Sequence, residues 1–280
     1  MTRPVTLIQA GFHMGLEEVA VGAGPRRLLD AGADRILACQ GIPAQVVHMR
    51  KAGEPADNLD AVVDLNRQIK QAVATAVEQD CLPVVLAGNC NSCLGTLAGL
   101  DATGLGIVWL DAHGDFHTPE TSISGSLEGM SLAVALGHCH SDLRERIGME
   151  SLVAEQNTLL LGVRDLDPGE PDRLAQSFVA VRPHDRLEDL PDLLDDLRTR
   201  VERIYLHLDV DFLDAQESPG VNYRGPGGVP VSMAEVLLGT ILSSIPLAAV
   251  NLTNFNPSLD RDQKTEQCAL RLLRTIAQNA

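Results

Sequence analysis

The sequence predicts an α/β fold in which helices cover one doubly wound, mostly parallel sheet. Short apolar runs alternate with amphipathic segments along the 280 residues, which is the pattern of strands joined by helices. Several runs are apolar at every position, as expected for parallel strands that are buried on both faces. No internal repeat or linker interrupts the alternation, so we expect a single domain over residues 1–280.

The predicted strands are short apolar runs bounded by polar or turn-forming residues. In chain order they cover residues 5–9, one or two segments within 35–49, and 83–87, 106–110, 158–163, 177–182, 203–208 and 247–252.

The predicted helices are segments whose apolar residues recur at helical spacing. The longest covers residues 59–79, where Asn58 can cap the first turn. Residues 187–202 are expected to form an acidic amphipathic helix whose charges face solvent. The other helices are expected at 16–30, after Cys93, and at 127–137, 232–243 and 262–277. A polar loop is expected at 50–57, and a loop rich in glycine and proline at 215–230 should lie beside the site.

Composition and charge restrict the classes of function. Hydrophobic residues make up 45% of the chain and charged residues 21%, which is typical of a globular protein. The 22 basic and 38 acidic residues give a formal net charge of −16, which argues against a nucleic-acid or anionic-membrane partner. Six cysteines lack the density of a secreted disulfide scaffold, and no targeting or membrane-spanning segment is visible. We therefore expect a cytoplasmic protein with reduced cysteines.

Two predicted strands are followed by segments in which every second residue is an aspartate or a histidine. Asp111, His113 and Asp115 follow one strand, and Asp209 and Asp211 follow another. Because strand side chains alternate in direction, each set should point to one side. Parallel strands place their carboxyl ends along one edge of a sheet, so the two sets can meet although about 100 residues separate them. Aspartates also occur in ordinary loops after strands, but two such ends favour a divalent metal site, with manganese as the best match to oxygen and nitrogen ligands.

Other candidate residues have more than one interpretation. Cys90 and Cys93 form a C-x-x-C pair after a strand, but no second pair or histidine spacing supports a zinc site. A redox role is open, because a helix N-terminus lowers the pKa of a thiol, while two small buried residues are the most common outcome. The His-Cys-His segment at 138–140 is interpreted as the end of a helix. Glu128 lies in the first turn of a predicted helix, where it favours the helix dipole or carries protons beside metal ions.

Three motifs together resemble the arginase/ureohydrolase superfamily. They are Asp-Ala-His-Gly-Asp at 111–115, Gly-Val-Arg-Asp-Leu-Asp at 162–167 and Asp-Val-Asp-Phe-Leu-Asp at 209–214, and their order and spacing match along nearly the whole chain. The resemblance implies a three-layer α/β/α fold with a central eight-stranded parallel sheet. It also implies a site with two manganese ions, hydrolysis of a guanidino group by a hydroxide that bridges them, and a trimer or hexamer.

The same resemblance assigns roles to the acidic residues. Asp111 and Asp209 would bridge the two manganese ions. His113 and Asp211 would complete the ligands of one ion, while Asp115 would bind the other and count among the catalytic residues.

The resemblance also implies a set of substrate-binding residues. Asp167 would bind a substrate α-amino group, and Ser124, with His117 and Ser126, would bind the α-carboxylate. Because this set is retained, an α-amino acid is favoured over a decarboxylated amine such as agmatine.

Three positions depart from the family pattern. The histidine ligand after the third strand is replaced by Cys90, a softer ligand that could hold its ion weakly. The histidine that carries protons in arginases is replaced by Glu128, which could do the same if its pKa is raised. The acidic residue that pairs with the guanidinium is replaced by Asn254, which offers hydrogen bonds without charge.

These departures favour a guanidine that is less basic than arginine. Our first hypothesis is hydrolysis of Nω-hydroxy-L-arginine to L-ornithine and hydroxyurea, as in a variant ureohydrolase branch of antibiotic biosynthesis that the chain resembles. The second is an arginase or another guanidino- or formimino-acid hydrolase. The third is a catalytically inactive binding or assembly subunit, which the retained metal ligands argue against.

Overall fold

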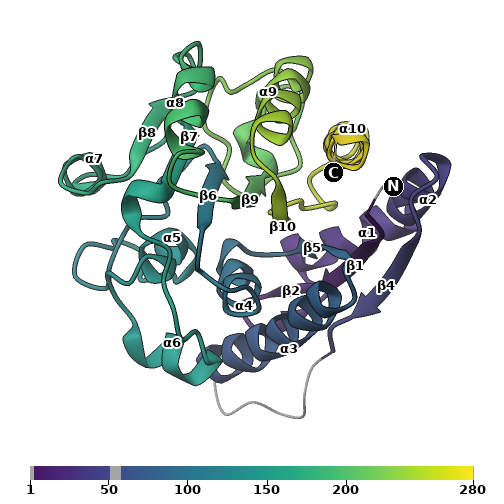
Figure 1. Cartoon of the computed structure of the whole chain (residues 1–280), viewed down its shortest axis with the longest axis horizontal. Coiled ribbons are helices and arrows are strands. Elements are labelled where there is room, and N and C mark those ends of the chain that lie inside the picture. The colour runs from purple at the N-terminus through teal and green to yellow at the C-terminus, as the bar shows by residue number, and fades with distance from the viewer. Residues whose placement is uncertain (1–2, 51–57, 280) are drawn as a thin grey trace.

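A central sheet of eight parallel strands runs through the part of the chain that the computed structural model describes, residues 3–50 and 58–279 (Figure 1). In spatial order, its strands are β4 (Ala44–His48), β1 (Val5–Ala10), β5 (Leu82–Ala87), β10 (Leu247–Thr253), β9 (Arg203–Asp209), β6 (Leu105–Leu110), β7 (Thr158–Val163) and β8 (Ala180–Pro183). Every pair of neighbours in this sheet is parallel, which confirms the prediction. A separate antiparallel pair joins β2 (Phe12–His13) to β3 (Leu16–Glu17).

Helices cover both faces of the sheet and complete three layers (Figure 1). One core packs against α1 (Gly24–Asp30), α2 (Ala33–Cys39), α8 (Leu190–Leu197), α9 (Val231–Ser244) and α10 (Lys264–Asn279). The other packs against α3 (Asn58–Glu78), α4 (Cys93–Ala98), α5 (Ser131–Ala135), α6 (Ser141–Ile147) and α7 (Glu170–Ala175). Single turns of 3-10 helix lie at η1 (Ala20–Ala23), η2 (Cys90–Ser92), η3 (Glu128–Met130), η4 (Glu155–Asn157) and η5 (Val210–Phe212). Within the described ranges, no helix is both long and apolar enough to cross a membrane.

The central strands supply side chains to both cores in alternation. In β6, Val108 and Leu110 belong to one core, whereas Ile107 and Trp109 belong to the other. This is the two-residue period of a strand, and covering both faces explains why the sequence of such a strand is continuously apolar. Each of these buried side chains stabilises the fold by roughly 1.5–3 kcal/mol relative to leaving it exposed.

The predicted helix over 16–30 is wrong in its first half. The chain forms β3 and η1 there, and α1 begins only at Gly24. Met14, Glu18 and Ala20 have φ angles of 48°, 53° and 49°, which are left-handed conformations incompatible with a right-handed helix. The apolar spacing could not reveal this turn, because these three residues are not glycines.

Other elements differ from prediction mainly in length. The segment 35–49 contains one strand, β4, but its first part belongs to the unpredicted helix α2. The predicted helix 127–137 is a 3-10 turn followed by the short α5, and 187–202 contains only the eight-residue α8. Helices α6 and α7 were not predicted. The predicted loop at 50–57 falls almost wholly on residues 51–57, which lie outside the described residues.

The strand order places the predicted ligands at one edge of the sheet. Leu110 at the end of β6 pairs with Leu208 in β9, and Asp209 at the end of β9 pairs with Thr253 in β10. The carboxyl ends of β5, β10, β9 and β6 therefore lie next to one another. Open α/β sheets build their sites at such an edge.

Candidate active site

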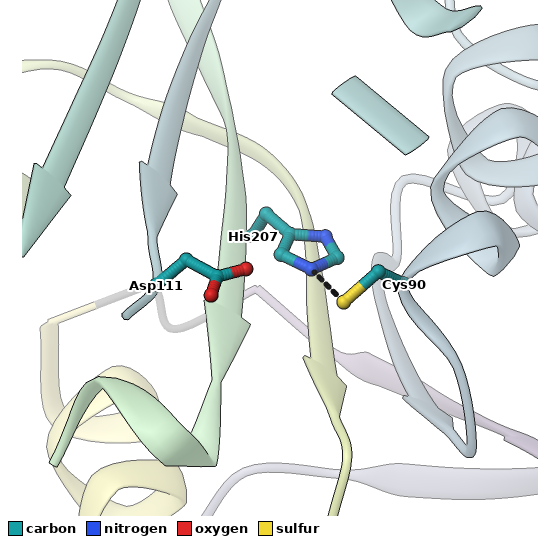
Figure 2. Close-up of side chains that lie close together, drawn as sticks. All are labelled: Cys90, Asp111 and His207. Carbon is teal, nitrogen blue, oxygen red and sulfur yellow. Dashed lines mark hydrogen bonds between the residues drawn. The ribbon is translucent and has the colours of Figure 1, made fainter. Parts of the chain in front are cut away.

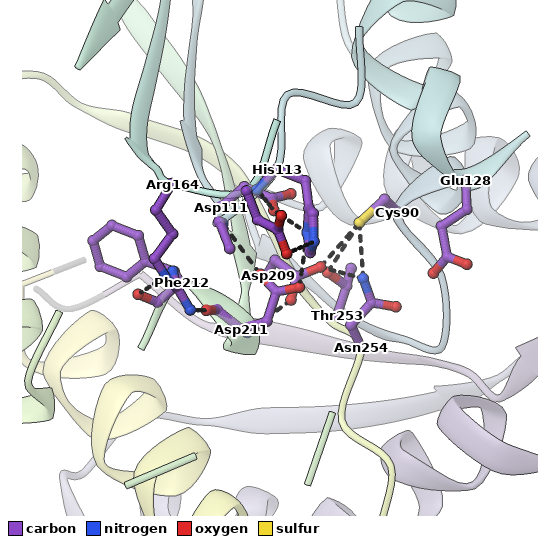
Figure 3. A network of polar contacts seen from close by, with 12 residues as sticks. Cys90, Asp111, His113, Glu128, Arg164, Asp209, Asp211, Phe212, Thr253 and Asn254 are labelled. Carbon is purple, nitrogen blue, oxygen red and sulfur yellow. Dashed lines mark hydrogen bonds and ion pairs between the residues drawn. The ribbon is translucent and has the colours of Figure 1, made fainter. Parts of the chain in front are cut away.

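His113 lies between two carboxylates at the ends of β6 and β9 (Figure 3). Its Nδ1 atom is 3.1 Å from Oδ2 of Asp211 and 3.4 Å from Oδ1 of Asp111. Nε1 of Trp109 donates to Oδ2 of Asp111 at 2.9 Å, and the amide of Ala112 donates to Oδ1 of Asp211 at 3.2 Å. The imidazole nitrogen and the two carboxylate oxygens lie within 4.8 Å of one another and could hold a metal ion.

Cys90, Asp209 and Asn254 form a second cluster beside the first (Figure 3). Sγ of Cys90 donates to Oδ2 of Asp209 at 3.2 Å. Nδ2 of Asn254 donates to the same oxygen and, at 3.1 Å, to Sγ. Cys90 also joins Asp111 and His207 in a group of potential metal ligands within 4.8 Å (Figure 2). The two ligand groups thus share Asp111, whose role as a bridging ligand stays a prediction.

Asp115 is held in the site by a rare backbone conformation. Its φ angle of 48° lies in the left-handed region, and the amides of Leu132 and Ala133 donate to its carbonyl oxygen. Its side chain is buried, and Oδ2 has no hydrogen-bond partner among the described residues. Asn254 has the same combination, with a φ angle of 66° and an unpartnered Oδ1 atom within that part of the chain. Buried polar atoms without partners are costly, so both oxygens are suited to receive an ion or a ligand.

The buried carboxylates raise one another's pKa values. Burial, followed by the charge of Asp211, raises the pKa of Asp111 to about 6. Burial also raises the pKa values of Asp115 and Asp209 well above their ordinary value, and the neighbouring carboxylates add to the rise. Although burial by itself lowers the pKa of His113, Asp211 and Asp111 raise it well above its ordinary value. Burial acts to raise the pKa of Asp211, but the charge of His113 and the hydrogen bonds from His113 and the amide of Ala112 together outweigh it, and the net shift is downward. His113 compensates only part of this buried negative charge, and divalent ions fit the remainder.

A pocket of about 270 Å³ opens onto the acidic cluster. Its floor includes the buried residues Asp209, Asp211 and Asn254, and its mouth includes the exposed residues Ser124 and Asp167. Small-molecule sites usually span roughly 300–1,000 Å³. The pocket is therefore suited to a ligand of about the size of an amino acid.

The residues predicted to bind an α-amino acid lie together in this pocket. Nε2 of His117 is 3.4 Å from Oδ2 of Asp167, and Oγ of Ser124 accepts a hydrogen bond from the amide of Ser126 at 3.2 Å. All four residues line the pocket. Their positions agree with the predicted set, while their roles stay predictions.

Glu128 lines the same pocket from η3. Burial raises the pKa of its carboxyl group to about 7, although a hydrogen bond with Asn89 opposes the shift. The negative charges of Asp211 and Asp111 add to the rise. A carboxyl group with a pKa near neutrality can take up and release a proton, which general acid–base catalysis requires.

Glu170 orients the loop that carries the first acidic motif. Its Oε1 atom accepts a hydrogen bond from the amide of Phe116 at 2.9 Å, and its Oε2 atom accepts one from the amide of Asp167 at 3.3 Å. A Cβ atom at Gly114 would lie 2.5 Å from Oε1, so glycine permits this close approach. Glu170 therefore joins the segment after β6 to the segment after β7. Its role depends on backbone amides from two loops, so no local sequence pattern predicts it.

Two further residues at the site were not identified from the sequence. His207 is buried in β9, and the available signal was its place in an alternating series with Asp209 and Asp211. Tyr223 lines the pocket, and its ring meets that of His113 edge to face with centroids 6.2 Å apart. The loop at 215–230 therefore lies beside the site, as expected.

The two cysteines of the C-x-x-C pair face different surroundings. Cys90 lies in the site, whereas Sγ of Cys93 donates to the carbonyl oxygen of Ser131 at 3.9 Å within a hydrophobic core. Both are free thiols. His138 pairs with Glu155 at 2.8 Å, in agreement with a structural role for the segment 138–140.

Comparison with known proteins identifies the class to which this fold and site belong. The protein-family model described as "Arginase family" matches residues 4–278 of this chain. The arginase of Brevibacillus brevis is 29% identical over 99% of this chain and 98% of its own length, and that of Bacillus subtilis (strain 168) is 32% identical over 81% and 79%, respectively. The structure of the arginase from Bacillus caldovelox matches with a TM-score of 0.88 at 27% identity and covers 98% of both chains. These matches define a metal-dependent hydrolase that acts on amidine C–N bonds. Within that class, the chain belongs to the arginase family.

Proposed function

We propose that the chain hydrolyses the guanidino group of an arginine-like α-amino acid, with Nω-hydroxy-L-arginine as the preferred substrate and L-ornithine and hydroxyurea as products. The relatives named above are arginases, which supports L-arginine as the alternative substrate. The observation that favours the hydroxylated substrate is the neutral side chain of Asn254 at the pocket floor.

Asn254 offers a substrate one neutral acceptor atom. Its Nδ2 atom is engaged by Asp209 and Cys90, which leaves Oδ1 to face a ligand. A guanidinium binds less strongly to this amide than to the acidic residue usual in the family, because hydrogen bonds to a carboxylate are roughly twice as strong as those between neutral groups. An N-hydroxyguanidine loses less binding strength, since its oxygen withdraws electron density and makes the group less basic. Its O–H and N–H groups can still donate to Oδ1.

The candidate ligand residues fit two manganese ions, one of which would be bound less tightly than the other. The residues that would hold them are Asp111 and Asp209 between the ions, His113 and Asp211 at one ion, and Cys90 and Asp115 at the other. When bound, the ions would lower the pKa of a shared water and supply the nucleophile for the planar guanidino carbon. The Sγ–H group of Cys90 points to Asp209, and an ion held by both residues would take the place of that proton. Manganese favours oxygen and nitrogen over a thiolate, so this ion is the one we expect to be held less tightly.

The other pocket residues orient the substrate and move a proton. Asp167 at the mouth binds the α-amino group, and Ser124, His117 and Ser126 surround the α-carboxylate. The substrate side chain then reaches toward the floor. Glu128, whose pKa is raised to about 7, delivers a proton to the departing nitrogen of ornithine.

Parallel assays of the two substrates test this proposal. Protein loaded with Mn²⁺ is incubated with L-arginine or with Nω-hydroxy-L-arginine, and the release of L-ornithine is measured. We expect kcat/KM to be at least about tenfold higher for the hydroxylated substrate, which corresponds to ~1.4 kcal/mol. Turnover of L-arginine alone would establish the alternative. If metal-loaded protein turned over neither compound, both readings would fall and a binding subunit would be favoured.

A further inference from the structure

His207 lies beside Cys90 (Figure 2), and each of its two ring nitrogens has a partner. Its Nε2 atom is 3.3 Å from Sγ of Cys90 and 3.4 Å from Oγ1 of Thr253. Its Nδ1 atom is 2.8 Å from the hydroxyl oxygen of Tyr205. The side chain is fully buried in β9. Although it belongs to one group of potential ligands, the proposed set of manganese ligands does not include it.

The ring of His207 is fixed by stacking on Trp109. The two ring centroids are 3.6 Å apart and the ring planes differ by 7°. Trp109 in turn donates from Nε1 to Oδ2 of Asp111 at 2.9 Å. The stacked pair therefore contacts Cys90 through one ring and Asp111 through the other, and these are two of the proposed metal ligands.

The contact between His207 and Cys90 is favourable for only one tautomer when the cysteine binds a metal. A cysteine ligand is a thiolate, which accepts hydrogen bonds but cannot donate one. At 3.3 Å, an unprotonated Nε2 atom would place its lone pair against the sulfur, whereas an Nε2–H group would donate to it. The contact with Tyr205 is compatible with the favourable form, because a hydroxyl that donates to Nδ1 leaves the ring proton on Nε2.

We propose that His207 is a positioning residue for Cys90: its Nε2–H group donates to Sγ and holds the sulfur facing Asp209, where a shared metal ion would bind. Tyr205 fixes the tautomer and Trp109 fixes the plane of the ring. This role rests on the proposed function, in which Cys90 is a metal ligand. Groups that orient metal ligands in this way typically change metal affinity about 10–100-fold when they are removed.

Cobalt binding provides the test, with Co²⁺ alone as the probe. A thiolate bound to Co²⁺ absorbs in the near ultraviolet through charge transfer from sulfur to metal. His207→Phe keeps a flat ring to stack on Trp109 but has no N–H group. We expect it to weaken Co²⁺ binding about 10–100-fold and to move the charge-transfer band to longer wavelength, because a sulfur without its hydrogen bond holds its lone pairs less tightly.

Three companion variants make the result specific. Tyr205→Phe removes only the hydroxyl that selects the tautomer, and we expect a smaller shift of the band in the same direction. Cys90→Ser should abolish the band. Cys93→Ser is the matched control, since Cys93 lies in the core and should leave both band and affinity unchanged.

The outcomes separate this role from the function on which it rests. A wild-type protein without the charge-transfer band would show that Cys90 is not a ligand, and both proposals for this residue would fall. A band that Cys90→Ser removes, but that His207→Phe and Tyr205→Phe leave unmoved at unchanged affinity, would overturn the role of His207 alone. A loss of one bound ion with altered visible bands in His207→Phe would show that His207 is itself a ligand, which also overturns positioning. If His207→Phe lacks a cooperative thermal transition, the shift in Tyr205→Phe decides.

Discussion

The two halves of the cluster of polar residues beneath the pocket hold charge in different ways (Figure 3). The half at the ends of β6 and β9 is a cluster of ions, in which His113 lies 3.1 Å from Asp211 and 3.4 Å from Asp111. Opposite charges there compensate one another in part. The chain keeps every residue that the family resemblance assigns to the metal ion bound by His113 and Asp211.

The half after β5 and β10 uses neutral groups instead. Cys90 and Asn254 form hydrogen bonds around the carboxylate of Asp209, and Glu128 lies on the same side of the cluster (Figure 3). All three departures from the family pattern thus gather in one half. Under the proposed function, the charged half would support the chemistry common to the family and the neutral half would determine which guanidine is accepted.

The largest effect is expected from Glu128→Gln, which removes the proton carrier of the neutral half. General acid–base groups contribute about 10²–10⁴-fold to rate, so we expect kcat for Nω-hydroxy-L-arginine to fall by a factor in that range. KM and the Mn²⁺ content should change little, because the residue is not a proposed ligand. Steady-state kinetics and metal analysis check this together. Unchanged kcat would show that the proton comes from elsewhere.

Cys90→Ser tests whether the neutral half holds a metal ion. Loss of the thiolate should lower Mn²⁺ affinity at least about tenfold, or ~1.4 kcal/mol, as measured by titration calorimetry of metal-free protein. Cys93→Ser is the control, because its side chain is equally buried but its thiol donates to the carbonyl oxygen of Ser131 and not to Asp209. Equal and negligible effects of the two changes would return Cys90 to a structural role.

Asn254→Glu should make the neutral half resemble the charged half. An added carboxylate pairs with a guanidinium, so we expect the ratio of kcat/KM values to move toward L-arginine by about fivefold, or ~1 kcal/mol. Asn254→Gln is the matched control. Glutamine has the same side-chain length as glutamate and the same backbone strain at a φ angle of 66°, but it carries no charge. If both variants move the ratio equally, charge is not the cause.

The last prediction concerns the stability of metal-free protein, not the rate or the substrate preference. The folded pKa values of Asp111 and Glu128, about 6 and about 7, exceed their ordinary values of 3.8 and 4.5. Between these values the folded chain keeps protons that the unfolded chain has released, so stability falls as the pH rises from about 4 to about 7. The lowered pKa of Asp211 acts below this window. One pKa unit corresponds to about 1.4 kcal/mol.

Thermal unfolding of chelator-treated protein across that pH range measures this effect. We expect Tm to decrease over this range, and Mn²⁺ to raise Tm more at pH 7 than at pH 5. A Tm of the metal-free protein that stays constant or rises over the range would contradict the assignment of raised pKa values to these carboxyl groups.

Most of the sheet could be predicted because its strands are buried on both faces. Runs such as 106–110 and 158–163 are apolar throughout, and this pattern does not depend on distant contacts. The region 16–30 was mispredicted because its path depends on left-handed residues that carry side chains, among them Glu18 and Ala20. Short helices such as α7 contain too few turns for a periodic pattern to be visible.

The candidate site was predictable to the extent that its residues follow strands directly. Asp111 and Asp209 stand at strand ends, where the sequence places them without knowledge of the fold. Glu170 and His207 act through partners more than 50 residues away in sequence, the amide of Phe116 and the sulfur of Cys90. Their significance depends on the order of the strands, which local patterns do not specify.

The left-handed backbone at Asn254 limits how this pocket can be altered over evolutionary time. Few residue types occupy that conformation at little cost, and asparagine and aspartate are the ones that carry a polar side chain of the same shape. Exchange of the amide for a carboxylate would keep the main chain in place, but it would remove the Nδ2 donor that contacts Asp209 and Cys90. A change of charge at this position would therefore require a compensating change in one of these two partners.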